Sequence, residues 1–220
     1  MSRQGNIPAR KVRPRNAPGT RAAILEAAER IFAEAGDAGA RTDAIAAAAG
    51  VNKALLYYYF KSKDGLYRAV LEKHLKEFHR QADEILDAKG SARSTVLRYV
   101  EMHFDFMSSR PYYPRLFQRM AMAGEGALNR LTRKHRLPLA RKFIAVIERG
   151  VRGGEFRRVD AVHAAFSIFG LTVSYFVAAP AVRAVTGMDL YDPRNLERRR
   201  EQMLDFVRHA LFRSPEAVVR

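Results

Sequence analysis

The sequence contains no cysteine in 220 residues. Disulfide bonds, thiolate metal sites, iron–sulfur clusters and cysteine nucleophiles are therefore excluded. Glycine and proline occur at an ordinary frequency, 14 and 9 residues, which excludes collagen-like and low-complexity chains. The first residues include no apolar run of the kind that a signal peptide requires, so we expect a location in the reducing cytoplasm.

The chain also lacks the short motifs that mark common catalytic sites. Its six histidines are scattered, and none pairs with a second histidine four residues away across a glutamate, as a zinc-binding helix requires. No GxGxxG, P-loop GK[ST] or GxSxG motif occurs. We therefore expect no enzyme, no metal site and no cofactor.

Acidic side chains are few compared with basic ones. Lysine and arginine number 39 against 23 for aspartate and glutamate, a net charge of +16. Residues 1–16 hold five basic side chains and no acid, residues 17–66 hold six of each, and residues 67–220 hold 28 basic and 17 acidic. Such an excess attracts polyanions. We expect residues 1–18 to form a flexible basic arm, which either follows a DNA groove or only aids solubility.

The hydrophobic pattern is helical from one end of the chain to the other. Apolar residues recur at helical spacing, and no run of alternating apolar and polar residues favours a sheet. The expected helices are 20–35, 42–48, 53–59, 63–88, 92–108, 113–123, 126–135, 138–152, 159–179 and 195–212. We predict an all-α chain with a three-helix unit at 19–66, a larger helical body at 67–213 and a tail at 214–220.

Residues 164–182 carry no charge, and a run of this length comes near to spanning a membrane. Ser167, Thr172 and Ser174 dilute the run, and Pro180 interrupts it. A buried helix of the body is the better interpretation, so we expect no membrane partner.

Residues 41–60, RTDAIAAAAGVNKALLYYYF, carry the main indication of function. Gly50 is placed to end one short helix in the left-handed conformation, and Asn52 is placed to cap the next. Two short helices joined in this way make a helix-turn-helix, whose second helix enters the DNA major groove.

The second short helix divides into two faces. Leu56 and Phe60 lie one turn apart and point to the core, whereas Lys53, Ala54, Tyr57 and Tyr58 share the opposite face. Lysine reaches guanine acceptors or phosphates, alanine lets the backbone approach base edges, and tyrosine hydroxyls donate to phosphate oxygens. Lys61 and Lys63 flank this face and suit phosphate contacts.

Residues 20–66 resemble the N-terminal domain of the TetR/AcrR family of bacterial transcriptional regulators. The resemblance rests on TRAAILEAAERIFAEAG at 20–36 and IAAAAGVNKALLYYYFKSKDGL at 45–66; beyond it, only GGEFRRVD at 153–160 is similar. It implies phosphate contact by Thr42, base contacts by Lys53, Ala54 and Leu55, and backbone contacts by Tyr57, Tyr59 and Lys63. The face division favours Tyr58 where the resemblance favours Tyr59, and both stay open. The combined DNA-binding set is Arg41, Thr42, Asn52, Lys53, Ala54, Leu55, Tyr57, Tyr58, Tyr59, Lys61 and Lys63.

Three residues depart from the family pattern. Asn52 stands where serine or threonine is usual, Ala54 replaces a frequent glycine, and Leu55 replaces a frequent threonine or serine. Leu55 therefore lacks a polar contact, and a thymine methyl group is the partner that suits it instead.

A single short helix reads few bases, so specificity requires two copies on a two-fold site. The expected function is a sequence-specific DNA-binding transcriptional regulator: a homodimeric repressor that a small-molecule effector releases from a palindromic operator. The alternative is a non-specific nucleic-acid or anionic-surface binding protein. Apolar stripes on the last two long helices predict the dimer interface, unless they are core of one chain: Phe166, Val173, Phe176, Met203, Phe206, Val207 and Ala210.

The resemblance also implies an effector pocket within the body, although the same residues equally suit plain core. The candidates are Tyr99, His103, Phe106, Phe117, Phe143, Phe169 and Tyr175. Residues 130–158 add ten basic side chains against two acids, which suits an anionic effector, additional DNA attraction or only a solvated face.

Overall fold

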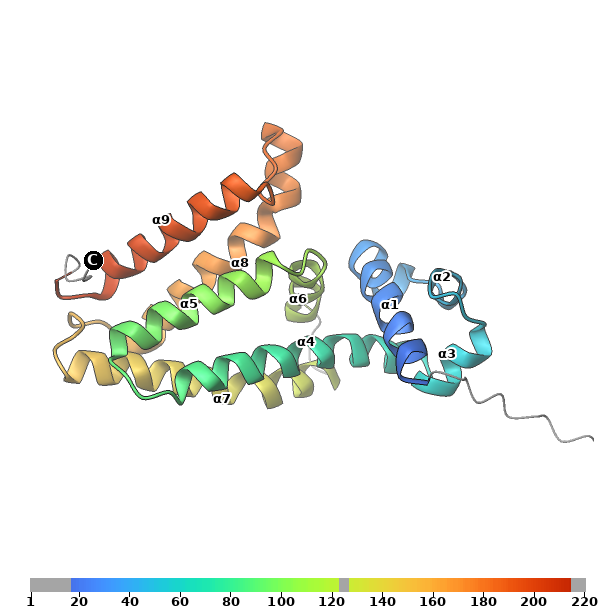
Figure 1. Ribbon diagram of the computed structural model, residues 1–220, viewed down its shortest axis with the longest axis horizontal. Helices are drawn as coiled ribbons and strands as arrows, with labels where there is room; N and C mark the ends of the chain where they lie inside the picture. Colours follow the sequence, from blue (N-terminus) through green and yellow to red (C-terminus); the bar gives the residue numbers. More distant parts are fainter. Residues whose placement is uncertain (1–16, 123–126, 215–220) are drawn as a thin grey trace, which may run out of the picture. The chain divides into compact units, whose positions relative to one another are not determined.

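The computed structural model describes residues 17–122 and 127–214, and every helix or strand of regular length in these ranges is an α-helix (Figure 1). The predicted all-α class is confirmed. The chain divides into two compact units, one ending at Tyr67 and the other beginning at Arg68. Most of the expected basic arm, residues 1–16, and most of the expected tail lie outside the described residues.

The first unit contains three helices and the beginning of a fourth: α1 (Ala17–Gly39), α2 (Thr42–Ala48), α3 (Lys53–Phe60) and the start of α4 (Lys63–Leu86). Its core is the apolar stripe of α1 packed against the buried side of α2 and two residues of α3. The buried side chains include Ile24, Ala28, Phe32, Ile45, Leu56 and Phe60. This packing holds α3 by one face and leaves the other face exposed.

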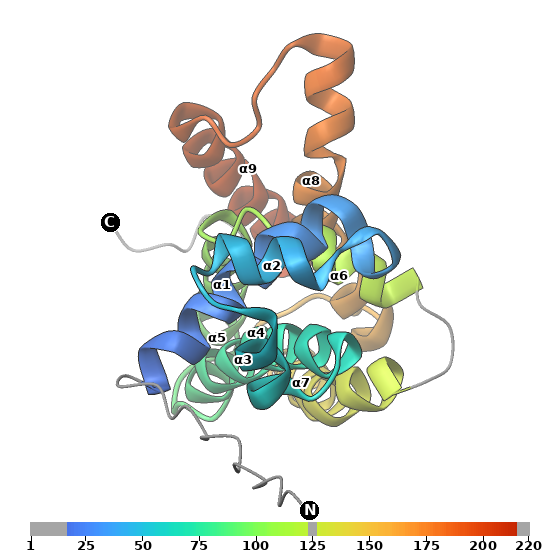
Figure 2. The ribbon, with the colours of Figure 1, turned by 90° about the vertical axis from the view of Figure 1, so that its right-hand side faces the viewer.

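The second unit contains the rest of α4 together with α5 (Ala92–Ser108), α6 (Tyr113–Met122), α7 (Ala127–Arg152), α8 (Ala161–Thr186) and α9 (Pro193–Leu211). Helix α5 packs against α7, α8 and α9, and α6 packs against α7 and α8. The resulting core is rich in aromatic rings from all these helices except α9. Figure 2 shows the C-terminal half of α8 extending away from α5 and α7 within this unit.

Residues after α7 close one corner of the second unit. The Glu155 carboxylate accepts the backbone N–H groups of Ala92 and Arg93, both at 3.1 Å, and so satisfies the free amides at the start of α5. Next to it, the rings of Phe156 and Phe212 stack with centroids 5.5 Å apart. The short pairing between their backbones ties the end of α9 to this corner.

Two prolines expected to separate helices lie inside them instead. Helix α7 is continuous through Pro138, so the expected break between 135 and 138 is wrong. Helix α8 continues through Pro180 to Thr186, where Gly187 ends it with a φ of 73°; the expected loop at 180–193 is therefore too long. A proline removes one helical hydrogen bond, but buried side chains after Pro138 and before Pro180 keep each helix packed.

The stop expected at Gly36 is confirmed, because Gly36 has a non-helical φ of 73° and kinks α1 there. A further turn follows the kink and ends at Gly39. At its other end α1 begins at Ala17, within the range expected for the arm.

By length and a mean hydropathy of 1.7, α8 is also the one helix of the described residues that would suit a membrane span. Ile168, Thr172 and Phe176 are nevertheless buried against the rest of the body. The Thr172 hydroxyl contacts Met203 of α9 at 3.5 Å. The helix is thus part of the helical core along one side, while much of its other side is apolar and exposed.

Candidate nucleic-acid interface and body cavity

The turn between α2 and α3 has the geometry that the sequence predicts. Gly50 takes a left-handed φ of 65°, and Val51 donates its N–H to the Ala46 carbonyl at 2.9 Å. The Asn52 side chain caps α3, because its Oδ1 accepts the N–H of Leu55 at 2.8 Å. Glycine takes this φ without strain, and the free amides at a helix start need such an acceptor. The structural roles expected of Gly50 and Asn52 are confirmed.

Helix α3 presents one side to the core and the other to solvent. Leu56 and Phe60 are buried, and Leu55 is half-buried at the edge. The exposed residues, which we call the reading face, are Lys53, Ala54, Tyr57 and Tyr58. The division into two faces that the sequence predicts is therefore confirmed. A lysine, a small residue and two hydroxyls on one exposed helix face suit a groove lined by base edges and phosphates.

The structure places Tyr58 and Tyr59 in different environments. Tyr58 is 52% exposed, and the Lys61 ammonium lies 5.5 Å from its ring centroid. The Tyr59 side chain is half-buried, and its hydroxyl is enclosed without a hydrogen-bond partner in the part of the chain that the structure describes. The Tyr58 hydroxyl is thus the one more open to a phosphate.

Lys53 is held by an acidic neighbour that the sequence pattern does not reveal. Its Nζ lies 2.9 Å from Oδ1 and 3.2 Å from Oδ2 of Asp43, which projects from α2. The hydrogen bond and the opposite charge of Asp43 raise the pKa of Lys53, so the ammonium stays protonated. Both side chains are about half exposed, so a nucleic-acid group can compete with the carboxylate for Lys53.

The residues at the start of α2 are divided between surface and interior. Arg41 is exposed at the N-cap position. Thr42, to which the resemblance assigns a phosphate contact, is buried, and its Oγ1 lies 3.5 Å from the Tyr57 hydroxyl. Thr42 thus supports the position of Tyr57 on the reading face.

Both flanking lysines are engaged by the protein. Lys61 donates to the Tyr58 carbonyl at 3.0 Å, and Lys63 donates to the Asp37 carbonyl at 2.6 Å. The Ser62 hydroxyl accepts the N–H of Gly65 at 2.9 Å. One of the free amides at the start of α4 is therefore satisfied within the protein.

The body contains an aromatic cavity of about 220 Å³, which we call the body cavity. Three of the seven expected pocket residues line it, namely Tyr99, Phe143 and Phe169. The Tyr99 and Phe143 rings stack with centroids 4.2 Å apart, and burial raises the pKa of Tyr99 to about 12. The full lining comprises Phe78, Tyr99, Arg136, Leu139, Ala140, Phe143, Ile144, Val162, Ala165, Phe166 and Phe169.

Two further expected pocket residues lie behind this lining. The His103 ring stacks on Phe169 at 5.6 Å, and Phe117 meets the same ring edge-on at 5.8 Å. Burial, with a smaller effect of the Arg136 charge, lowers the pKa of His103 to about 3, so the imidazole is neutral at physiological pH.

Tyr175 and Phe106 do not belong to the body cavity. The Tyr175 hydroxyl donates to the Leu190 carbonyl at 3.0 Å and lies 3.4 Å from that of Asn195, so it anchors the connection between α8 and α9. The expectation that Tyr175 lines the same cavity as Phe169 is wrong because of their spacing. Residues six apart on a helix point in directions that differ by well over a right angle about the helix axis.

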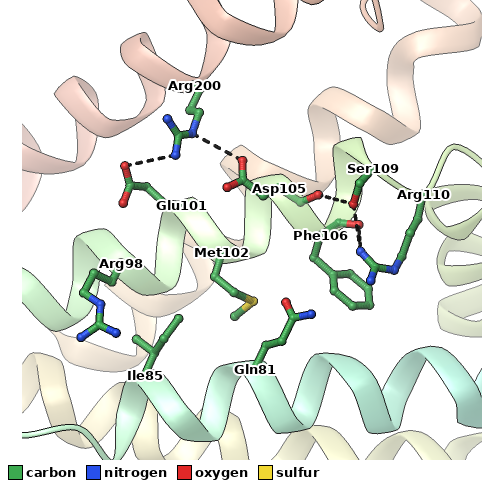
Figure 3. A pocket seen from close by; sticks show the side chains of 10 residues that line it. All are labelled: Gln81, Ile85, Arg98, Glu101, Met102, Asp105, Phe106, Ser109, Arg110 and Arg200. Atoms are coloured by element: carbon green, nitrogen blue, oxygen red, sulfur yellow. Dashed lines mark hydrogen bonds and ion pairs between the residues drawn. The ribbon is translucent and has the colours of Figure 1, made fainter.

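Phe106 instead lines a second hollow, a groove of about 420 Å³ beside α5 that we call the charged groove (Figure 3). Arg200 reaches from α9 to Glu101 and Asp105, with nitrogen–oxygen distances of 3.4 Å to each carboxylate. Arg110 lies over the Phe106 ring at 3.9 Å. The charges of Arg200, Glu101, Asp105 and Arg110 are thus engaged within the protein.

Sequence reasoning missed Arg136 as a lining residue of the body cavity. Its guanidinium carbon lies 4.4 Å from the ring centroid of Phe117 and 5.7 Å from that of Phe169. One of its terminal nitrogens donates to the Tyr113 hydroxyl at 2.9 Å. The described residues include no group of acidic and histidine side chains that suits a metal ion.

The residues expected at a dimer interface divide by exposure. Phe166 is 73% exposed on α8 and Phe206 is 56% exposed on α9. Phe176, Met203 and Val207 lie in the core of the single chain, and this burial removes them from the interface set. Val173 and Ala210 are half-buried.

Comparisons with known proteins agree with this architecture. Residues 24–70 match the family described as bacterial regulatory proteins, tetR family, and residues 93–207 match the tetracyclin repressor-like C-terminal domain. The HTH-type transcriptional regulator RutR of Escherichia coli K12 is 32% identical over 190 residues, which cover 86% of this chain and 89% of RutR.

Two solved structures share the fold. The ketosteroid transcriptional regulator KstR2 of Mycobacterium tuberculosis matches with a TM-score of 0.74 and 19% identity, over 88% of this chain and 95% of that one. AibR, solved in complex with isovaleryl coenzyme A and operator DNA, matches with a TM-score of 0.72 and 17% identity, over 86% and 97% of the respective chains.

Proposed function

The chain belongs to the TetR family and is a DNA-binding transcriptional regulator, and from this premise we propose that it acts as a homodimeric repressor released from a palindromic operator by a small molecule. The observation that carries the proposal is the reading face of α3, which exposes a lysine and two tyrosine hydroxyls on the second helix of a helix-turn-helix. Such a protein acts inside the cell, where its DNA is.

Base contacts fall to Lys53, with Ala54 allowing close approach and Leu55 meeting a thymine methyl group at the edge. The hydroxyls of Tyr57 and Tyr58 suit phosphates, with Arg41 as a further cation at the start of α2. Lys61 and Lys63 add further phosphate contacts once DNA phosphates replace the backbone carbonyls that these lysines now contact.

Dimerisation is supported by the exposed apolar side of α8 and by Phe206 of α9. Large aromatic side chains exposed on two packed helices mark a protein contact. Two-fold pairing of α8 and α9 would form a four-helix bundle and would present two reading faces to one palindromic site. The contact centres on Phe166 and Phe206, with Val173 and Ala210 beside them.

Effector release is supported by the body cavity. It is enclosed by α4, α5, α7 and α8, and most of its lining is apolar or aromatic, as small-molecule sites are. A coupling free energy in the usual range would shift operator affinity about 5-fold to 150-fold when the cavity fills.

The test begins with selection of bound fragments from genomic DNA. Fluorescence anisotropy then compares a selected duplex with a shuffled duplex of the same composition. We expect the selected duplex to bind at least about 10³-fold more tightly. Equal affinity for both would refute the proposal and favour a non-specific polyanion-binding protein. A single subunit at the concentration that saturates the operator would refute the dimer.

Two variants locate the binding surface. Lys53→Ala is expected to weaken binding of the selected duplex about 5-fold to 150-fold, with a smaller loss on the shuffled duplex. The control Lys89→Ala removes the same charge from an exposed position in the loop after α4. If the two variants lose the same affinity, Lys53 contributes only general electrostatic attraction.

A further inference from the structure

We propose that the body cavity binds a small carboxylate with an apolar aromatic or branched body, and that Arg136 binds the carboxylate group. This inference rests on the proposed function, because it names the chemical class of the effector.

The first observation is where the charge lies. Arg136 points into the aromatic cluster, with its guanidinium carbon 5.3 Å from the centroid of Phe78 in addition to its contacts with Phe117 and Phe169. Rings attract the cation through their faces, but they leave most of its N–H donors unused. The charge is thus placed among apolar groups instead of in open solvent.

The second observation is that this charge has no counterion among the residues that the structure describes. The Tyr113 hydroxyl accepts one hydrogen bond, but among the described residues Arg136 forms no ion pair, and no acidic side chain lines the cavity. The Nε atom of Arg136 is enclosed and has no acceptor in the same part of the chain. The Arg136 side chain is half-buried, and a guanidinium, which keeps its proton in proteins, gains from an acceptor where apolar groups exclude part of its water. A ligand carboxylate supplies the missing acceptor.

The third observation limits the polar chemistry of the site. His103, directly behind Phe169, is neutral, and its enclosed Nε2 has no partner within the described residues. The Tyr99 phenol also stays protonated. Of the described residues that line the cavity, Arg136 is the one charged group, and a cationic ligand would meet repulsion without compensation.

The size and lining define the rest of the ligand. The volume of about 220 Å³ is small for a ligand site and suits a single ring or a short branched chain. The stacked rings of Tyr99 and Phe143 provide a flat apolar wall. Val162 and Phe166 belong to the lining and are exposed in the single chain, so the cavity opens beside the proposed dimer contact at Phe166.

The experiment uses the full chain and three sets of probes with matched carbon skeletons. Benzoate, 3-phenylpropanoate and isovalerate are compared with the corresponding amides and amines in thermal denaturation and isothermal calorimetry. We expect at least one acid to raise the melting temperature in a saturable way, whereas its amide and amine do not. Binding of the amide as tight as that of its acid would overturn the inference, and so would the failure of all three acids.

Variants of Arg136 identify the group that binds the acid. Arg136→Met keeps the apolar stem and is expected to weaken binding of the acid about 10-fold to 150-fold, the usual loss of a hydrogen bond to a charged group. Arg136→Met/Tyr113→Phe also removes the hydroxyl that would lose its donor, so it serves if the single variant folds poorly. Arg133→Met, exposed on the same helix, is the matched control and should bind normally.

Operator binding without ligand separates this inference from the proposed function. If Arg136→Met binds the acid as tightly as the wild type, the assignment of Arg136 fails even though DNA binding is intact. If the wild type shows no preference for the selected duplex, the proposed function fails whichever acid the cavity binds.

Discussion

A methyl group added at Gly150 directly tests how tightly the second unit is packed around Phe156, where the chain after α7 meets the end of α9. A Cβ atom built there would lie 2.4 Å from both Cδ2 and Cε2 of Phe156 and 2.9 Å from Cβ of Ala92. The ring has no room to retreat, because Phe156 is 2% exposed and stacks against Phe212 with an interplanar angle of 2°. Its backbone is also fixed, since its N–H donates to the Gly150 carbonyl at 3.0 Å.

Two opposing effects decide the outcome of Gly150→Ala. Replacing glycine by alanine inside a helix gains about 1 kcal/mol in helix propensity. Overpacking a rigid core costs about 1–3 kcal/mol and occasionally more. Contacts of 2.4 Å to a fixed ring place this site at or beyond the upper end of that range, so the expected net loss is about 2 kcal/mol. The melting temperature should fall by about 4–8 °C in a unit of this size.

Thermal unfolding followed by circular dichroism measures this effect, together with Phe156→Leu and the double variant. Leucine lacks Cε2 and the flat ring, so it relieves the clash. The double variant should therefore be more stable than the sum of the two single effects predicts, by about 0.5–3 kcal/mol. A Gly150→Ala protein as stable as the wild type would refute the packing argument, as would strict additivity of the two substitutions.

Four further outcomes are expected. Asp43→Asn frees Lys53 and should tighten operator binding severalfold at low salt; unchanged affinity in anisotropy would show that the ion pair does not compete with DNA. Glu155→Ala leaves two amides at the start of α5 without an acceptor and should cost about 1–3 kcal/mol in chemical denaturation, which a normal midpoint would contradict. Phe206→Asp should yield monomers in analytical ultracentrifugation while the helical content stays normal; an intact dimer would move the interface elsewhere. Deletion of residues 2–16 should flatten the salt dependence of operator affinity, and an unchanged slope would leave the arm without a DNA contact.

The helix-turn-helix could be predicted because its determinants are local. Gly50 sets the turn, Asn52 caps the next helix, and the spacing of Leu56 and Phe60 fixes which side of α3 is exposed. All these residues lie within about three turns of one another along the chain. Asp43 was not predicted as the partner of Lys53, because periodicity within each helix does not show how two helices are oriented across a turn.

The ends of the longer helices were predicted less well, because local stop signals such as proline compete with the packing of side chains in the core. Pro138 and Pro180 are strong stop signals by their covalent geometry. The free-energy cost of one missing hydrogen bond is nevertheless small compared with the free energy gained when a continuous helix buries its apolar area. Leu139 and Phe143 after the first proline, and Ala179 before the second, are all buried and keep each helix intact.

The mistaken break at Pro138 also explains why Arg136 was missed. When α7 is continuous, Arg136 precedes Leu139 by three residues, Ala140 by four and Phe143 by seven, which places all four on one helix face. When the segment is divided at the proline, the same arginine belongs to a separate basic helix and looks like a solvated charge. Whether a charged residue near a proline lies on the surface or lines a pocket thus depends on whether the helix continues through the proline. That continuity is set by contacts with α4, α5 and α8, from Phe78 to Phe169, which no local pattern in the sequence contains. The residues that we propose to contact DNA can therefore be predicted from a short segment, whereas the proposed ligand chemistry of the body cavity depends on the packing of four helices around Arg136.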